Sequence, residues 1–504
     1  MKMSISQRLW SCASYLLLLC LLMACSAPSI VKSPTPTAIS VNALPGAGSC
    51  LKQGKNVPQA NIRVSHDSYL AHSETMLVED PLNPLHLVGG SKFFTDPAHY
   101  RFQIGYFTSF DGGCTWLDGG VLPGFDARTI TSDPSFAFAP DGKHVYAAYL
   151  FAASASQPGE NGIAVSTSVD GGKTFEAPVV AFATKARDVL NDKPWITVDQ
   201  TRGIRRGTVY ITWSYDHHGE CGYGNACSQE LAFVRSTDNA KTFSPLRQVE
   251  GSAPFCTNPA KGRPAHSTLC DAVLGTIPVV EPDGTLAVAS AYEDLMNRHI
   301  PTRLMLTTTP DGGNTWASPL LVATIHDVSG FFRPERYRNV SLPAFACDPR
   351  SGQLYLAWSD KGKDADILFS TSKDGGKTWS VPVRVNDDPM NDGANQFQPQ
   401  LVVAPDGVIS VSFFDTRLDP RHRLIDVYLA QSIDKGVSFL KNVRVTTESW
   451  NPEHGAPIDE NGAQFIGDYQ GLAADNTFVH PFWNDTRTGK QEIFTAAISS
   501  VQGK

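Results

Sequence analysis

A short pattern of Ser, Asp, Gly, Thr and an aromatic residue recurs along this chain, and it limits the fold more than any other feature. The pattern occurs six times, fully at 109–116, 168–175 and 372–379 and in weaker form at 236–243, 309–316 and 432–439. Copies that return every 59 to 73 residues are not a chance match. They predict one repeat architecture instead of several unrelated domains.

The residue types of the pattern suit a tight turn between two strands. In the first copy, Ser109 and Asp111 offer side-chain oxygens that bond turn backbone groups, and Gly113 permits a positive φ. The aromatic residue that ends each copy is expected to pack inward. The aspartates of the pattern are therefore expected to hold the fold together and to take no part in catalysis.

Strand-like stretches surround each turn. Residues 134–139, 145–149 and 163–166 alternate or run apolar before the copy at 168, and the same order returns in the later repeats. A unit of four antiparallel strands repeated around an axis leaves few exposed sheet edges. The sequence therefore predicts an all-β propeller of four-stranded antiparallel blades.

The number of blades depends on how the two ends of the chain meet. A seventh unit follows the last turn, but the chain ends where its outer strand is due. Residues 61–65 lie before the first inner strand and are well placed to supply that strand and close the ring. Seven blades are therefore predicted, with six as the alternative.

The N-terminal segment is expected to be a targeting sequence and not part of the fold. Lys2 and Arg8 precede a short apolar stretch, which ends in Leu22-Met23-Ala24-Cys25 and resembles a bacterial lipobox. The predicted organisation is a signal peptide at 1–25, a flexible tether rich in Pro, Ser and Thr at 26–50, and the propeller at 51–504. Lipidation of Cys25 would anchor the protein to a membrane; an ordinary cleavage site and an uncleaved anchor are the alternatives. All three predict an exported or cell-envelope protein.

Charge and cysteines agree with export. The formal net charge is -8 without a run of Lys or Arg, so nucleic acid is not an expected partner, and a monomer is expected. Disulfides are expected outside the cytoplasm. The candidate pairs are Cys221 with Cys227, Cys256 with Cys270, and Cys50 with Cys114, whereas Cys347 is expected to be a buried free thiol.

Polar residues recur at one end of the predicted blades. The connection into each inner strand and the loop after each second strand open on the same face of a propeller, where ligands bind. Candidates there are Glu74, Asp133, Arg338, Asp468 with Tyr469, Arg298, Asp415 with Arg417, and Asp485 with Arg487. For the Asp-Arg pairs, structural ion pairs between blades are the alternative to a binding role.

The repeated turn is the Asp-box, and through it the whole mature chain resembles the sialidase superfamily. Such enzymes hold a sugar carboxylate with three Arg residues and attack with a Tyr activated by a Glu, while an Asp acts as acid and base. The resemblance assigns the nucleophile to Tyr469, its base to Glu74 and the proton donor to Asp133 or Asp468. It assigns the carboxylate clamp and its surroundings to Arg298, Arg338, Arg417, Arg487, Asp415 and Asp485.

The chain departs from the family at one informative place. The Phe-Arg-Ile-Pro motif of the first blade, which supplies a clamp Arg, is replaced by Ser73-Glu74-Thr75, and Arg63 is only a faint echo on an outer strand. The leading prediction is an extracytoplasmic sialidase-like glycoside hydrolase that acts on terminal sugars. The alternatives are a non-catalytic propeller that binds a glycan or a protein, and an envelope assembly factor.

No cofactor is predicted. Asp387 and Asp388 with Asn391, Asp392 and Gly393 could offer oxygen ligands to calcium, but their spacing is not that of an EF-hand loop. Zinc-protease, phosphate-loop and dinucleotide motifs are missing from the sequence.

Overall fold

The structure is a computed structural model of the chain. It describes residues 50–51, 60–153, 160–218, 228–249, 251–256, 268–293, 301–328, 330–331, 337–459 and 462–501. The predictions on Cys25, on Arg298 and on the Cys221–Cys227 pair lie outside the described residues. Within these ranges no helix has both the length and the apolar character needed to cross a bilayer.

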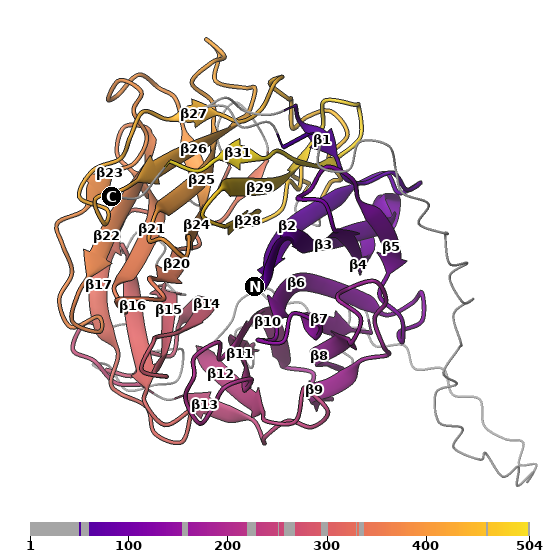
Figure 1. The fold of residues 1–504 in the computed structure, drawn as a ribbon, viewed down its shortest axis with the longest axis vertical. Helices are drawn as coiled ribbons and strands as arrows, with labels where there is room; N and C mark the ends of the chain where they lie inside the picture. The colour runs from indigo at the N-terminus through magenta and orange to yellow at the C-terminus, as the bar shows by residue number, and fades with distance from the viewer. Residues whose placement is uncertain are drawn as a thin grey trace, which may run out of the picture.

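Among the described residues, six four-stranded antiparallel sheets and one sheet of five strands form seven blades, and the seven-bladed prediction is confirmed. Figure 1 shows the blades arranged around a central axis. Blade 1 consists of β2 (His72–Asp80), β3 (Asn83–Asp96), β4 (Arg101–Ser109) and β5 (Leu117–Val121). Blade 2 consists of β6 (Ile130–Phe138), β7 (Val145–Ala152), β8 (Asn161–Ser168) and β9 (Val179–Thr184). Blade 3 consists of β10 (Val189–Val198), β11 (Val209–His217), β12 (Ser228–Ser236) and β13 (Arg247–Val249). A short 3-10 helix, η1 (Pro97–His99), joins β3 to β4.

The later blades repeat the same order from the axis outward. Blade 4 consists of β14 (Val273–Val280), β15 (Leu286–Tyr292), β16 (Thr302–Thr309) and β17 (Leu320–Ile325). Blade 5 consists of β20 (Ala344–Cys347), β21 (Leu354–Lys361), β22 (Ala365–Ser372) and β23 (Val383–Arg384). Blade 6 consists of β24 (Gln396–Val403), β25 (Ile409–Asp415), β26 (Asp426–Ser432) and β27 (Val443–Arg444). A hairpin of β18 (Gly330–Phe331) and β19 (Arg338–Asn339) is inserted before blade 5.

Blade 7 is built from both ends of the chain. Its strands are β28 (Gly471–Ala474), β29 (Phe478–Asp485), β30 (Glu492–Thr495) and, on the outside, β1 (Ile62–Arg63), while β31 (Ile498–Ser499) pairs with the far end of β29. Ile62 pairs with Thr495 and Arg63 with Phe494. Figure 1 shows the indigo strand beside the yellow ones. The predicted closure by residues 61–65 is confirmed, and the six-bladed alternative is excluded.

The Asp-boxes form hydrogen-bonded turns. In blade 1, Ser109 Oγ accepts the amide of Gly113 at 2.9 Å and donates to Asp111 Oδ1 at 2.9 Å. The second carboxylate oxygen of Asp111 accepts the Thr115 hydroxyl at 2.7 Å. Every acceptor of Asp111 thus serves the turn, which confirms that the box has a structural role.

The aromatic residues of the boxes join neighbouring blades. Trp116 of the first box lies 5.5 Å from Phe482 of blade 7, and Phe175 of the second lies 4.7 Å from Tyr106 of blade 1. The same contact recurs farther along the ring between Trp316 and Phe233, at 5.2 Å. Each of these rings therefore packs on the preceding blade, where buried aromatic pairs add to the hydrophobic stabilisation.

Two disulfides are observed among the described residues, Cys50–Cys114 and Cys256–Cys270, as predicted. The first ties the N-terminal arm to the box of blade 1. Cys347 is a free thiol, as predicted, but it is half-buried, whereas the prediction was a buried thiol.

Candidate functional site

The inner strands of five blades carry a bulge at the same point, just after they leave the mouth of the ring. Their pairing registers shift there, and the residue at the bulge has a φ of 49° to 66°. A bulge re-aims a side chain, and a positive φ is uncommon outside glycine. The bulged residues are Glu74, Asp133, Lys193, Gly275 and Gln398.

Charged side chains from distant blades meet at this level. Lys193 Nζ of blade 3 lies 2.6 Å from Asp468 Oδ2, on the connection into blade 7, and 3.6 Å from Asp133 Oδ1 of blade 2. Arg338 donates from Nε to Asp468 Oδ1 at 3.1 Å and from Nη2 to Oδ2 at 2.5 Å. We call Glu74, Asp133, Lys193, Arg338 and Asp468 the axial cluster.

Glu74 has a partner of its own, Lys92 on β3. The Lys92 Nζ lies 2.8 Å from Glu74 Oε2, and both side chains are buried. Lys92 also lies 4.3 Å from the Phe102 ring and 4.7 Å from the Phe465 ring. Lys92 could not be recognised from the sequence, because nothing in its neighbourhood distinguishes it from a solvent-facing lysine on a strand.

Burial and charge move the pKa values of the axial cluster apart. Burial, and next the charge of Asp133, raise the pKa of Glu74 to about 7. Burial acts in the same direction on Asp468, but Arg338 and Lys193 outweigh it and hold the pKa of Asp468 well below its usual range. The cluster therefore combines a carboxyl group that titrates near neutrality with a permanently charged carboxylate.

Tyr469 does not have the surroundings expected of a nucleophile. Its hydroxyl donates to the main-chain carbonyl of Pro134 at 3.3 Å, where the prediction required a carboxylate. The ring is 7% exposed and packs 5.4 Å from Trp195. Burial raises the pKa of Tyr469 well above its usual value, so the phenol is hard to ionise. The Tyr469 ring lies beside the axial cluster, 5.9 Å from Lys193 Nζ, but its hydroxyl is directed to the main chain of blade 2.

The two Asp-Thr-Arg repeats form internal ion pairs. Arg417 donates to Asp415 Oδ2 at 2.7 Å from Nε and to Asp387 Oδ1 at 2.5 Å from Nη1. Arg487 donates to Asp485 Oδ2 at 2.9 Å from Nε, and its guanidinium lies 4.6 Å from the Phe494 ring. Arg338, Arg417 and Arg487 thus each pair with a carboxylate of the protein, and their role as a clamp for a sugar carboxylate stays a prediction.

Two further predictions have a clear structural outcome. Arg63 lies on the outer strand β1, as expected, and pairs with Glu492 at 3.4 Å. In the loop that could offer ligands to calcium, the two adjacent aspartates form ion pairs with arginines. Asp387 pairs with Arg417, and Asp388 pairs with Arg384 at 3.0 Å. Their charge is therefore already balanced within the protein.

A pocket opens beside the axial cluster, on the mouth face. It has a volume of about 570 Å³ and lies between the β3–β4 loop and the connection into blade 7. Its lining residues are Pro97, Ala98, His99, Tyr100, Ala456, Pro457, Ile458 and Asp459. An aromatic contact links the pocket to the axial cluster. The Tyr100 ring lies 5.9 Å from the Phe465 ring, and the Phe465 ring lies 5.1 Å from the Arg338 guanidinium. This pocket could not be recognised from the sequence, because it joins segments far apart in the chain.

The comparisons with known proteins agree with the repeat. A family model described as a BNR repeat-like domain matches residues 220–449, which contain four of the six boxes. None of the curated proteins matches the chain.

Solved structures with similar folds include a protein of unknown function from Dyadobacter fermentans. It is 14% identical, with a TM-score of 0.48, and the match covers 76% of this chain and 98% of the other. The Hadza microbial sialidase Hz136 is 16% identical, with a TM-score of 0.46 and coverage of 82% and 73%. The NanB sialidase from Streptococcus pneumoniae is 12% identical, with a TM-score of 0.42 and coverage of 88% and 70%.

Proposed function

We propose that this chain, a BNR-repeat β-propeller of the sialidase-like superfamily, is an exported protein whose mouth binds the end of a glycan without hydrolysing it. One observation carries the proposal: the Tyr469 hydroxyl donates to the Pro134 carbonyl from a buried position. A phenol held in that way donates to a main-chain carbonyl oxygen, which is not a base that could take its proton. The disulfides support a location outside the cytoplasm.

The pocket at the mouth supports binding. Its volume of about 570 Å³ lies within the range of small-ligand sites. Tyr100 offers an amphipathic ring, and Pro457 and Ile458 offer apolar contact to a sugar face. The lining holds no lysine or arginine. A neutral sugar end is therefore favoured over a sialic acid.

Hydrolysis is the second candidate, and a specific observation favours it. Glu74 has a pKa of about 7, while the pKa of Asp468 is strongly lowered. Two carboxyl groups whose pKa values are pushed apart are the usual arrangement for general acid and base chemistry. In that case Glu74 would donate the proton and Tyr469 would have no role.

A binding screen and an activity assay on the same purified protein separate the two candidates. We expect the wild-type protein to bind neutral glycan ends on an array and to release no fluorophore from sialosides or neutral glycosides. Tyr100→Ala should abolish binding, whereas Phe110→Ala, which removes an exposed ring outside the pocket lining, should leave it intact. Turnover by the wild-type protein that is lost in Glu74→Gln would overturn the binding proposal in favour of hydrolysis.

A further inference from the structure

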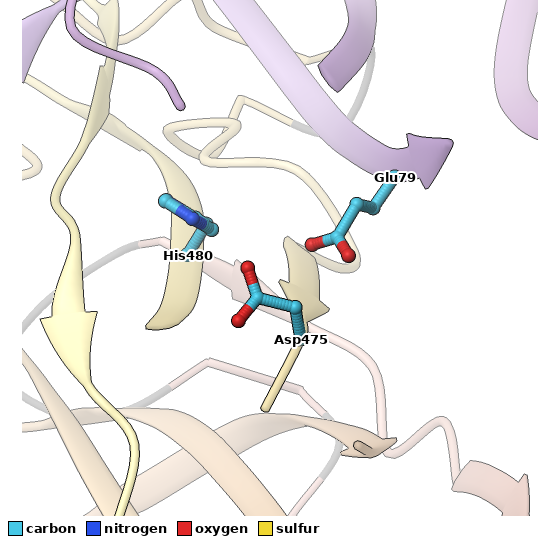
Figure 2. A group of neighbouring side chains, drawn as sticks. All are labelled: Glu79, Asp475 and His480. Carbon is cyan, nitrogen blue, oxygen red and sulfur yellow. The ribbon is translucent and has the colours of Figure 1, made fainter. Parts of the chain in front are cut away.

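A second group of ionisable residues gathers on the opposite face of the ring from the mouth. Glu79 lies at the end of β2 in blade 1, Asp475 follows β28 in blade 7, and His480 lies on β29. One nitrogen or oxygen from each side chain lies within 4.8 Å of the others. Figure 2 shows the two carboxylates and the imidazole turned toward a shared space at the seam between the blades.

His480 is the most informative member of this group. It is 1% exposed, yet neither Nδ1 nor Nε2 has a hydrogen-bond partner. A buried polar group without a partner costs free energy, so native proteins rarely leave one unsatisfied. A ligand at one of the His480 ring nitrogens would supply the missing partner.

His86 provides a matched contrast from the same face. It is also buried, at 5% exposed, but its Nδ1 lies 3.0 Å from Asp80 Oδ2 and its Nε2 lies 2.7 Å from the Gly171 carbonyl oxygen. The protein thus pairs both nitrogens of His86 and leaves both nitrogens of His480 without a hydrogen-bond partner, one of them close to two carboxylates.

The acidic side chains of this face also differ in whether their oxygens have hydrogen-bond partners. Asp475 Oδ1 accepts the main-chain amides of Thr477 and, at 2.9 Å, of Phe478, which fixes the orientation of the group. Glu79 Oε2 is buried without a hydrogen-bond partner. Asp80, the neighbouring acid, is engaged by His86 and by the Leu82 amide at 2.8 Å. Glu79 and His480 therefore each have a buried polar atom without a hydrogen-bond partner, and a cation between them would coordinate both.

We infer that Glu79, Asp475 and His480 bind a divalent transition metal, with Zn²⁺ as the ion of choice, and that the ion fastens blade 1 to blade 7 where the ring closes. One imidazole nitrogen and two carboxylate oxygens suit zinc, which holds such ligands at about 2.0–2.2 Å. Two ligand atoms of a tetrahedral zinc ion at that distance lie about 3.4 Å apart. The three groups, now within 4.8 Å of one another, would therefore move closer on binding, and water would complete the coordination.

The test uses the purified protein after removal of metal with a chelator. Titration with ZnCl₂ in a calorimeter should give one ion per chain, and CoCl₂ should give the visible absorption of a low-symmetry nitrogen and oxygen site. Glu79→Gln and His480→Gln should each weaken binding by at least about 10–100-fold, the loss caused by removing even an outer partner of a metal ligand. His86→Gln should bind as the wild-type protein does.

Thermal unfolding gives a second readout that a merely structural role would not reproduce. Added Zn²⁺ should raise the Tm of the wild-type protein in proportion to the logarithm of its concentration, and should not raise that of Glu79→Gln. Because Glu79 is half-buried and its Oε2 makes no hydrogen bond, this variant should fold even if His480→Gln does not. The inference is overturned if the wild-type protein takes up neither ion stoichiometrically, or if Glu79→Gln takes them up equally well.

Discussion

Lys193 Nζ lies 2.6 Å from Asp468 Oδ2, so that a side chain of blade 3 reaches the connection into blade 7 across the mouth of the ring. The guanidinium of Arg338, from the hairpin before blade 5, holds the same carboxylate with two hydrogen bonds. Residues separated by 275 positions thus share one buried charge. The mouth of this propeller is built as a network of ion pairs before any ligand arrives.

Removal of the lysine should reveal how strongly the ring depends on this network. Lys193→Met leaves Asp133 without its cation and Asp468 with Arg338 alone, and breaking a buried ion pair on one side costs about 3–5 kcal/mol. Urea unfolding should show a loss of this size. Lys185→Met is the control, because Lys185 is 81% exposed and pairs with Glu160 at only 3.8 Å. Equal stability of the two variants would contradict a structural role for the cluster.

The pH dependence of stability should carry the signature of Glu74. Its pKa is about 7 in the folded protein, against an ordinary value of 4.5, so folding favours the protonated form. The stability that this group contributes is fully present below pH 4.5 and is lost as the pH rises toward 7. Glu74→Gln mimics the protonated form at every pH.

We therefore expect the free energy of unfolding of the wild-type protein to fall relative to Glu74→Gln between pH 4.5 and 7, and to run parallel to it above that range. Chemical denaturation at a series of pH values measures the difference. Parallel curves over the whole range would show that Lys92 already compensates the Glu74 charge.

The fold could be predicted from the sequence, because the Asp-box is a local signal. Ser109, Asp111 and Gly113 make their hydrogen bonds within one turn, so the sequence records the turn directly. A fixed spacing between turns then implies repeated blades, and the missing outer strand of the last blade implies closure by residues near Ile62. Each of these inferences needs only the order of residues along the chain.

The chemistry of the mouth could not be predicted in the same way. Tyr469 and Asp468 are neighbours in the sequence, and only the path of the chain into blade 7 decides that Asp468 bonds Lys193 while the Tyr469 hydroxyl bonds the Pro134 carbonyl. The partner of Glu74 was equally hidden, since Lys92 becomes its neighbour through the pairing of β2 with β3. Contacts between distant residues depend on side-chain direction, which composition and spacing do not record.

The Asp-box hydrogen bonds should be measurable one at a time. Ser372 is 1% exposed, and its Oγ accepts the buried Gly376 amide at 2.9 Å. Ser372→Ala leaves that amide without a partner, which costs about 1–3 kcal/mol. Thr378→Val removes a hydroxyl from the exposed side of the same turn, where water replaces it, and should cost clearly less. The order of the two free energies of unfolding checks the prediction, and the reverse order would contradict it.

Cys347 should be a slow thiol in the native protein. Burial, and next the charges of Glu281 and Asp348, raise its pKa to about 12. At pH 8 roughly one molecule in ten thousand then carries the reactive thiolate. Iodoacetamide should label the peptide that contains Cys347 slowly under native conditions and quickly in urea, as mass spectrometry can follow. Equal rates in both conditions would show that the thiol is not shielded.

Asn61 should control how firmly the ring is closed. Its Oδ1 accepts the amide of Thr447 at 2.7 Å and Nη1 of Arg487 at 2.9 Å, and its Nδ2 donates to the Val445 carbonyl at 2.9 Å. These bonds tie the N-terminal strand to the connection between blades 6 and 7, beside the backbone pairing of β1 with β30. Asn61→Ala should cost about 1–3 kcal/mol, because several polar groups lose one partner together.

Hydrogen exchange distinguishes this local effect from a general loss of stability. In Asn61→Ala, amides of residues 62–64 and of β30 should exchange faster, while those of blades 2 to 5 keep their protection, because opening starts at the seam. Asn61→Asp is the matched control, since it keeps the oxygen that faces Thr447 and Arg487 and loses only the bond to Val445. Uniformly faster exchange in all blades would mean that the ring opens as one unit and that the closing strand has no separate stability.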